Sequence, residues 1–197
     1  MQASKPPHFH FLLLTSHQIS NVVGWVDFER ELALDAVEET FEHRAEIASV
    51  AYDPSNAHWL QSRFEPDDTY VAFYRKGKCT IAGCSSIEHA SEVADRVVAL
   101  MRDLLQFSGD PPRGINNIVA TFDFGQEVSP EELIINLGFD NIEYEPEIFP
   151  AVVYRGDYFV GLIFASGKCI VTGVASEKRV SDAVEEVNKL LANEIDD

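Results

Sequence analysis

The chain has 197 residues, of which 46% are hydrophobic and 11% aromatic, and this composition excludes a disordered chain. No apolar run approaches the ~18–20 residues of a membrane-spanning helix, and the short run at residues 9–15 has no small-residue cleavage site, so we expect neither membrane attachment nor a signal peptide. The 33 acidic and 15 basic residues give a net charge of −18, which by itself argues against a nucleic-acid partner and, because few of the bases are lysine, suits the high-salt cytoplasm of a halophilic archaeon.

The first predicted elements follow an N-terminal extension, residues 1–17, in which Phe9 and Phe11 suggest an added strand. An alternating strand at residues 21–28 leads into a helix with apolar residues three and four apart. After further strands, a long amphipathic helix with Ser86 as its N-cap closes this half of the chain. Its apolar face consists of Val93, Val97, Leu100, Met101 and Leu104.

The second half repeats this order of elements. A strand at residues 117–124 precedes a helix that begins with Ser129 as N-cap and Pro130 in the first turn, and that ends at Gly138. Strands follow at residues 152–155, 159–165 and 168–174, with a hairpin turn at residues 166–167. A closing helix, N-capped by Ser176, has an apolar face of Val180, Val184, Val187, Leu190 and Leu191.

The two halves are an internal duplication, because short motifs recur at a nearly constant spacing. The motif at residues 21–23 (NVV) returns as NIV at 117–119, YDP at 52–54 returns as YEP at 144–146, and GKC at 77–79 returns at 167–169. The period of ~90 residues is far longer than the 20–50 of solenoid repeats. We therefore expect repeat 1 at 18–107, a linker at 108–113 and repeat 2 at 114–197, with an acidic C-terminal end.

Two copies of strand–helix–strands–helix predict an α+β fold. The two pseudo-symmetric repeats are expected to share one antiparallel sheet that has helices on one face and is open on the other. Because side chains alternate along a strand, the open face can be read from the sequence. In repeat 2 it carries Asn117, Val119, Leu162, Phe164, Lys168, Ile170 and Thr172.

The predicted strands of repeat 2 contain no acid between residues 150 and 155, 160 and 165, or 168 and 174, so the negative charge is expected on helices and loops. An apolar, acid-free face with Asn and Thr suits the minor groove of A·T-rich DNA, whose floor offers hydrogen-bond acceptors. Composition alone supports equally well a face that is buried by a dimer partner or by another domain.

Catalytic and metal-binding patterns are missing from the sequence. The three cysteines form no CxxC pair, the six histidines have no metal-binding spacing, and there is no GxSxG, GxGxxG or P-loop motif. We therefore expect free core thiols, no metal, no cofactor and no enzyme activity.

The sequence resembles the TATA-box-binding protein family. The segments YEPEIFPAVVYR at 144–155, LIFASGK at 162–168 and VTG at 171–173 are similar to the family's second-repeat signature, and NIV at 117–119 is similar to its opening strand. The resemblance spans roughly residues 18–195. It implies a saddle-shaped sheet with helices on the convex face, and a protein that kinks DNA by wedging apolar side chains into the minor groove.

The resemblance also implies roles for individual residues of repeat 2. Phe149 and Phe164 match the pair that wedges into a base step at one end of the box, and Pro150 lies beside them. The matches to groove-floor contacts are Asn117, Val119, Leu162, Ile170 and Thr172, and the matches to phosphate contacts are Arg155 and Lys168. On the second stirrup loop, the matches to the surface that receives transcription factor B are Glu145, Glu147 and Ile148.

Repeat 1 departs from the family pattern. It retains Asn21, Val23, Arg63 and Lys78, but ungapped alignment from Tyr52 puts Ala57 where the first wedging Phe belongs and Tyr74 where the second belongs. The small residues Ala72, Thr80 and Ala82 replace larger or better hydrogen-bonding groove residues. Trp59, two residues after Ala57, is a substitute wedge if the loop shifts.

Two hypotheses follow. The first is a general transcription initiation factor that binds double-stranded promoter DNA, recruits transcription factor B and acts indirectly on RNA polymerase in the archaeal cytoplasm, at the nucleoid. It is favoured by repeat 2. The second is a diverged relative that acts as a protein-binding regulator with weak DNA binding, which the substitutions in repeat 1 favour. On DNA we expect a monomer, with a dimer as an alternative in the free state.

Overall fold

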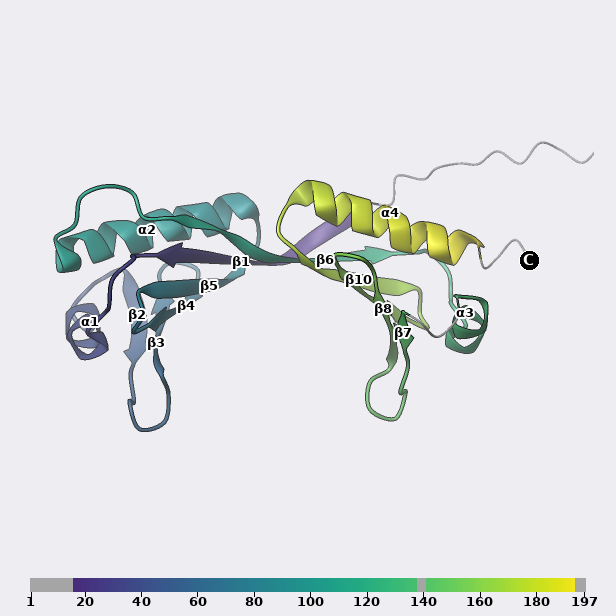
Figure 1. Ribbon diagram of the computed structural model, residues 1–197, viewed down its shortest axis with the longest axis horizontal. Coiled ribbons are helices and arrows are strands. Elements are labelled where there is room, and N and C mark those ends of the chain that lie inside the picture. Colours follow the sequence, from purple (N-terminus) through teal and green to yellow (C-terminus); the bar gives the residue numbers. More distant parts are fainter. Residues whose placement is uncertain (1–15, 138–140, 194–197) are drawn as a thin grey trace, which may run out of the picture.

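The computed structural model describes residues 16–137 and 141–193, and within these ranges it forms two similar halves (Figure 1). The first half consists of β1 (His17–Asp27), α1 (Leu34–Phe41), β2 (Ile47–Ala51), β3 (Trp59–Phe64), β4 (Thr69–Tyr74), β5 (Lys78–Cys84) and α2 (Ile87–Leu105). The second consists of β6 (Arg113–Asp123), α3 (Pro130–Leu137), β7 (Ile142–Glu143), β8 (Ala151–Arg155), β9 (Val160–Phe164), β10 (Lys168–Val174) and α4 (Glu177–Asn193). The predicted order of elements is confirmed in both halves.

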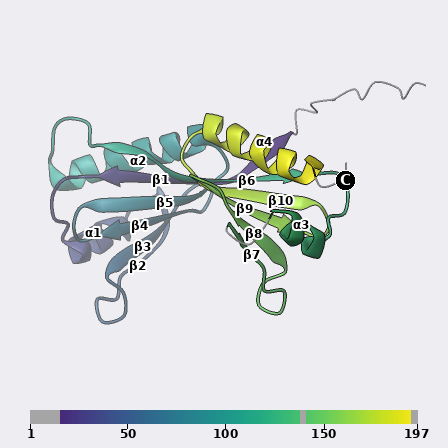
Figure 2. The same cartoon turned by 45° about the vertical axis from the view of Figure 1, so that its right-hand side comes forward.

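All the described strands belong to one antiparallel sheet, in the order β2-β3-β4-β5-β1-β6-β10-β9-β8-β7. The two halves meet where β1 pairs with β6, with Asn21 opposite Val119, Val22 opposite Ile118 and Val23 opposite Asn117. These are equivalent residues of the two repeats, so a pseudo-twofold axis passes between Val22 and Ile118. The predicted α+β saddle is confirmed (Figures 1 and 2).

The hydrophobic core lies between the sheet and the helices. The two long helices α2 and α4 run along one face of the sheet, while the β2–β3 and β7–β8 loops project on the other side (Figures 1 and 2). From α2 the core receives Val93, Val97 and Met101, and from α4 it receives Val180, Val184, Val187 and Leu191. Burial of one such side chain contributes roughly 1.5–3 kcal/mol, so these faces fix the helices on the convex side of the saddle.

The helix N-termini confirm the predicted caps. The Ser86 hydroxyl accepts a hydrogen bond from His89 N at 3.0 Å. Ser129 and Ser176 accept bonds from the backbone N–H groups three residues further on, each at 3.4 Å. Each cap pairs a donor that the first helical turn leaves without an intrahelical partner.

Several boundaries differ from the expectations. β1 begins at His17 and β6 at Arg113, four residues before the predicted strands, because each strand continues along the other across the pseudo-twofold axis. The short edge strand β7 was not separately predicted. The expected strand at Phe9 and Phe11, the helix end at Gly138 and the last four residues of the acidic end lie outside the described residues. Within the described part of the chain, the helices are all too short or too polar to cross a membrane.

Candidate nucleic-acid interface

The concave face of the sheet carries the residues predicted for the groove. Leu162 on β9 is the register partner of Ile170 on β10, and directly opposed residues point to the same face of a sheet. Both are half-buried, as are Asn21, Val23, Asn117, Val119, Phe164 and Thr172. The acids within the described strands are Asp27 and Asp123 at strand ends and Glu143 on β7. The middle of the concave face is therefore apolar and free of acids, despite the net charge of −18.

Two equivalent asparagines lie at the centre of this face with their amide groups oriented by the backbone. Asn21 Oδ1 accepts a hydrogen bond from Gly83 N at 3.0 Å, and Asn117 Oδ1 accepts one from Gly173 N at 2.8 Å. Both glycines have positive φ and lie at bulges in β5 and β10. Because each carbonyl oxygen is engaged, the NH₂ donors are left for the concave face.

The two asparagines differ in their second contact. Asn117 Nδ2 donates to Thr172 Oγ1 at 3.1 Å, whereas the residue equivalent to Thr172 in repeat 1 is Ala82, which has no hydroxyl group. The Asn21 amide thus has both donor hydrogens uncommitted among the described residues. The substitution to Ala82 frees a donor at the centre of the face.

Repeat 2 places an aromatic pair at its outer end. The Phe149 ring is 40% exposed, and its centroid lies 6.1 Å from that of Phe164 in an edge-to-face arrangement. Phe149 follows a tight turn in which its N–H donates to Glu145 O at 2.9 Å. Phe164 extends from the last position of β9. An exposed aromatic edge on a rigid turn has the geometry of a wedge.

Repeat 1 also has an aromatic pair at its outer end, but one of its two rings comes from a different position. In its β2–β3 loop, Ala57 N donates to Asp53 O at 2.8 Å, the same bond that Phe149 N makes to Glu145 O. The loop is therefore not shifted, and Ala57 occupies the position of Phe149. Trp59 instead lies at the first position of β3 and faces Tyr74, with ring centroids 6.3 Å apart.

Three of the predicted phosphate contacts are engaged with acids. Arg155 donates to both carboxylate oxygens of Glu143, at 2.9 and 3.0 Å, and this hydrogen bonding lowers the pKa of Glu143 below its ordinary value. Arg63 lies 3.7 Å from the Asp68 carboxylate. Lys78 lies 3.8 Å from that of Asp27.

The cations without an ion pair are distributed unequally. Among the described residues, Lys168 in repeat 2 and Arg75 and Lys76 in repeat 1 are concave-face cations without an acidic partner within 4.0 Å. Arg75 donates to the Tyr52 hydroxyl at 3.2 Å, which raises the pKa of the guanidinium, and the carboxylates of Asp35 and Glu31 add to this effect.

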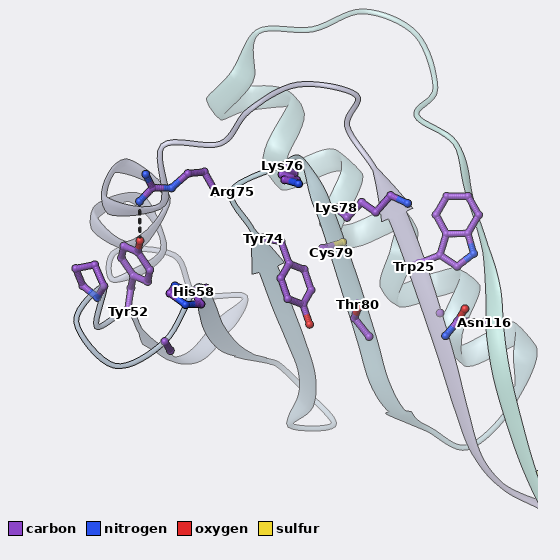
Figure 3. Close-up of a pocket in the computed structure, with 13 residues that line it drawn as sticks. Trp25, Tyr52, His58, Tyr74, Arg75, Lys76, Lys78, Cys79, Thr80 and Asn116 are labelled. Atoms are coloured by element: carbon purple, nitrogen blue, oxygen red, sulfur yellow. Dashed lines mark hydrogen bonds between the residues drawn. The ribbon is translucent and has the colours of Figure 1, made fainter. Parts of the chain in front are cut away.

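The concave face has a hollow at each end, and the two occupy equivalent places. The repeat 1 hollow has a volume of about 820 Å³ and the repeat 2 hollow about 640 Å³. Equivalent residues line both, including Lys78 and Lys168, and Tyr74 and Phe164. Figure 3 shows Tyr74, Thr80 and Trp25 on three neighbouring strands in the repeat 1 hollow.

The sequence interpretation did not include Trp25, although it alternates with Asn21 and Val23 along the same strand. That alternation was the signal that could have placed it on the concave face. Its equivalent in repeat 2 is the much smaller Thr121.

The second stirrup loop presents a separate surface. Ile148 is 79% exposed at its tip, and Glu145, Glu147 and Pro150 are also exposed. This surface combines an exposed aliphatic side chain with two carboxylates. It is complementary to a partner surface that is both apolar and basic.

Comparisons with known proteins agree with this geometry. The family described as "Transcription factor TFIID (or TATA-binding protein, TBP)" matches residues 16–104 and 113–193. TATA-box-binding protein C of Halobacterium salinarum is 35% identical over 174 residues, which cover 85% of this chain and 93% of that protein. The TATA-box-binding protein of Archaeoglobus fulgidus is 32% identical over 88% of this chain and 93% of its own length.

A solved structure has the same architecture. The Methanococcus jannaschii TBP superimposes with a TM-score of 0.73 at 29% identity, over 90% of this chain and 99% of that one. Sequence and fold therefore agree along both repeats. The chain belongs to the TATA-box-binding protein family, whose members are DNA-binding transcription factors and not enzymes.

Proposed function

We propose that the chain is a general initiation factor that binds A·T-rich promoter DNA through the minor groove, bends it and recruits transcription factor B. The observation that carries this proposal is the acid-free concave face with two amide groups oriented at its centre. The minor-groove floor of an A·T pair has only acceptors, N3 of adenine and O2 of thymine, while a G·C pair adds an amino donor. The NH₂ donors of Asn21 and Asn117 can hydrogen-bond to the acceptors of an A·T pair. At a G·C pair they would face another donor, the amino group of guanine.

Bending follows from the shape of the face. A saddle-shaped apolar surface contacts a minor groove along its length only if the groove opens and the duplex curves. Smooth bending costs on the order of 1–6 kcal/mol, which must be offset by the apolar area that Val119, Leu162 and Ile170 bury against the groove. Aromatic wedges at both ends lower the cost locally by unstacking one base step each.

Recruitment of transcription factor B is assigned to the second stirrup. Glu145, Glu147 and Ile148 are exposed on a turn that the Glu145 carbonyl holds with two backbone hydrogen bonds. A rigid, exposed acidic loop remains accessible when DNA fills the groove. This arrangement supports simultaneous binding of DNA and a second protein.

The test is a mobility-shift assay with an A·T-rich duplex in molar KCl, with and without transcription factor B. We expect a binary shift, and a further shift when the second protein is added. Asn117→Asp is a sharp control, because the carboxylate still accepts the hydrogen bond from Gly173 N but removes the donors and adds a charge. We expect this variant to keep its fold and lose DNA binding. Wild-type affinity of the variant would rule out the groove assignment.

The alternative, a protein-binding regulator with weak DNA binding, is favoured by one observation. Arg63 and Arg155, which match phosphate contacts, are both held by acids. The same assay separates the two functions, since the regulator would show only a weak binary shift at every salt concentration while still binding its partner protein.

A further inference from the structure

The first stirrup, which is the β2–β3 loop at residues 52–58, lacks the aromatic contact that connects the second stirrup to the sheet. In repeat 2 the loop residue Phe149 packs against Phe164 of β9, with ring centroids 6.1 Å apart. The equivalent loop residue in repeat 1 is Ala57, whose methyl group is too short for such a contact. Trp59 supplies the ring at this end, but it belongs to β3 and not to the loop. The position of the first stirrup must therefore be fixed by other residues.

The turn inside the first stirrup is held by its own hydrogen bonds. The Asp53 carbonyl accepts from Asn56 N at 3.1 Å and from Ala57 N at 2.8 Å. The Asp53 carboxylate accepts from the Ser55 hydroxyl at 2.6 Å and from Ser55 N at 3.0 Å, and these bonds lower the pKa of the carboxyl. A turn with this many internal bonds moves as one unit. Its position relative to the sheet therefore depends on the contacts of Tyr52, where the loop leaves β2.

Tyr52 is anchored at both its backbone and its side chain. Its ring is half-buried and packs against the hydrophobic core. Its N–H donates to Glu38 Oε1 of α1 at 2.7 Å. Its hydroxyl accepts a hydrogen bond from Arg75 Nη2 at 3.2 Å, and Figure 3 shows the guanidinium extending toward Tyr52. The loop is thus tied to α1 by one bond and to the β4–β5 hairpin by the other.

The backbone of Arg75 is a fixed point from which its side chain holds the loop. Leu32 N donates to Arg75 O at 2.8 Å, and Phe28 N donates to Gly77 O at 2.9 Å. Gly77 has a φ of +98°, and a Cβ at this position would clash with the carbonyl oxygen of Arg30. The β4–β5 turn therefore packs closely against the β1–α1 loop and cannot shift with the stirrup.

Repeat 2 has the same backbone frame without the arginine. Val128 N donates to Ala165 O at 2.9 Å, as the equivalent residues do in repeat 1. Ala165 occupies the position of Arg75, and its methyl group cannot reach the equivalent tyrosine, Tyr144. The repeat that has Phe149 in its loop thus has no arginine in its hairpin, and the repeat that has the arginine has alanine in its loop. The two contacts are alternative ways of fixing a stirrup.

The charges around Arg75 also favour a tether over a phosphate contact. The hydrogen bond to Tyr52 raises the pKa of the guanidinium, and the carboxylates of Asp35 and Glu31 add to this effect. These two acids offset part of the positive charge and repel a phosphate that approaches it. The guanidinium is therefore better suited to hold the loop than to bind DNA.

We infer that Arg75 is a positioning residue that tethers the first stirrup to the sheet through Tyr52, in place of the aromatic contact that Ala57 cannot make, and that it does not contact phosphate. The tether holds the loop at the mouth of the repeat 1 hollow, which these three residues line together. The loop is thereby ordered before DNA arrives, so binding does not have to order it. The effect on DNA rests on the proposed function, whereas the tether itself is tested on the free protein.

A nitroxide spin label on Asn56→Cys reports the motion of the first stirrup. Asn56 is exposed in the turn, and its backbone N–H, which donates to the Asp53 carbonyl, is kept by the substitution. The native thiols are buried and do not compete for the label; they are Cys79, Cys84 and Cys169.

We expect Arg75→Ala and Tyr52→Phe to increase the ratio of mobile to immobile label to the same extent. The increase should be about fivefold, which corresponds to the loss of one hydrogen bond of about 1 kcal/mol. The double variant should resemble either single variant, because both remove the same bond. Lys76→Ala is the matched control, since it removes a neighbouring positive charge and should leave the label unchanged.

DNA binding then separates a tether from a phosphate contact. If Arg75 contacted a phosphate, Arg75→Ala would flatten the plot of log K against log salt by about 0.9. If it is a tether, the slope stays the same and the affinity falls about fivefold at every salt concentration. Lys76→Ala removes the same charge and should flatten the slope.

Transfer of the tether to repeat 2 tests it as a gain of function. A label on Ile148→Cys, at the position equivalent to Asn56, reports the second stirrup. Phe149→Ala should make this label mobile, because the loop loses its aromatic contact. Adding Ala165→Arg, which places a guanidinium within reach of Tyr144, should restore the immobile spectrum.

An unchanged label in both Arg75→Ala and Tyr52→Phe would overturn the tether. A flatter salt slope in Arg75→Ala would overturn the second part of the inference and place this residue at a phosphate. If the repeat 1 variants fail to fold, the transfer decides, since an Ala165→Arg variant that leaves the second stirrup mobile would refute the inference. Absence of any DNA binding would overturn the proposed function but not the tether, which the label reports in the free protein.

Discussion

Trp59 lies directly opposite Tyr74 across the β3–β4 pair, with their ring centroids 6.3 Å apart. Repeat 1 therefore has an aromatic pair at its outer end even though Ala57 replaces the residue equivalent to Phe149. The pair is set two residues further along the chain, at a strand position instead of a loop position. An aromatic pair is thus present at each end of the groove although the sequence pattern is broken.

We predict that Trp59→Ala will reduce both affinity and the DNA bend angle, because one end of the groove loses its wedge. The loss should be on the order of 1–3 kcal/mol, the usual effect of removing one aromatic stacking contact with a base. Fluorescence energy transfer between dyes at the two DNA ends measures the bend. Trp59→Phe retains an aromatic ring and is the control. A Trp59→Ala complex with wild-type bending would show that repeat 1 does not intercalate.

Phe149→Ala and Phe164→Ala are expected to have the same effect at the other end, with the fold intact, since Phe149 is 40% exposed and supports no core contact. The expected loss is again about 1–3 kcal/mol. Ile135→Ala is the matched control, because Ile135 is a 74% exposed apolar side chain on α3, outside the concave face. If either Phe variant kept the wild-type bend, the wedge assignment would be incorrect.

Reversing both stirrup charges, with Glu145→Arg and Glu147→Arg, should abolish the complex with transcription factor B but not DNA binding. Like charges placed against a basic partner surface cost several kcal/mol. Native gel electrophoresis with labelled promoter DNA distinguishes the two complexes. Glu39→Arg with Glu42→Arg, on the exposed side of α1, changes the net charge equally and should leave both complexes intact. Loss of the binary complex in the stirrup variant would place these residues at the DNA instead.

The salt dependence of DNA binding should be shallow or inverted. Each neutralised phosphate contributes a slope near −0.9 to log K against log salt. Among the described residues that line the two hollows, only Arg75, Lys76 and Lys168 are cations without an acidic partner within 4.0 Å. If all three cations neutralise a phosphate, the slope is about −3. The net charge of −18 makes the slope less negative, because it repels DNA most strongly at low ionic strength. Titration with KCl from ~0.1 to ~2 M measures the slope. A steeper fall would mean that the acids lie too far from the DNA to matter.

Glu143→Gln should raise DNA affinity, because it releases Arg155 for a phosphate contact and makes the salt slope steeper by about one unit. It should also remove a pH-dependent part of the folding stability. The hydrogen bond from Arg155 lowers the pKa of Glu143 below its ordinary value of 4.5, so the pair stabilises the fold above that value. This contribution is lost as the pH falls through the lowered pKa.

Thermal unfolding of the wild type and of Glu143→Gln at a series of pH values tests the second part. The difference between their midpoints should be constant near neutral pH and should vanish on acidification below 4.5. A difference that persisted at low pH would show that Glu143 stabilises the fold by packing and not by its charge.

The open face could be predicted from the sequence because its determinants are local. Alternation along the strands places Asn117, Val119 and Thr172 on one side, and the recurrence of short motifs at fixed spacing reveals the duplication. Both follow from the period of a strand and from chain order, which a sequence displays directly.

The parts that could not be predicted depend on register between strands. A shift between β1 and β6 pairs Ile19 with the buried Ala120, so Ile19 packs on the helix side although simple alternation from Asn21 would put it in the groove. The same kind of shift brings Gly114 under Trp25. The bond from Arg155 to Glu143 requires β7 to pair with β8, and a two-residue strand leaves no periodic signal.

The β1–β6 pairing has the reciprocity of a contact between identical subunits, since Asn21 faces Val119 while its equivalent Asn117 faces Val23. A chain with a single repeat would leave one side of an 11-residue strand without partners, an edge that readily recruits another copy. Two such chains would pair their free edges through this same isologous contact. The two halves of their binding site would then be identical, so the site could not distinguish one direction along DNA from the other. Covalent fusion makes the association intramolecular and lets each half acquire its own mutations. The duplicated gene, unlike its single-repeat counterpart, is therefore able to encode direction along a promoter.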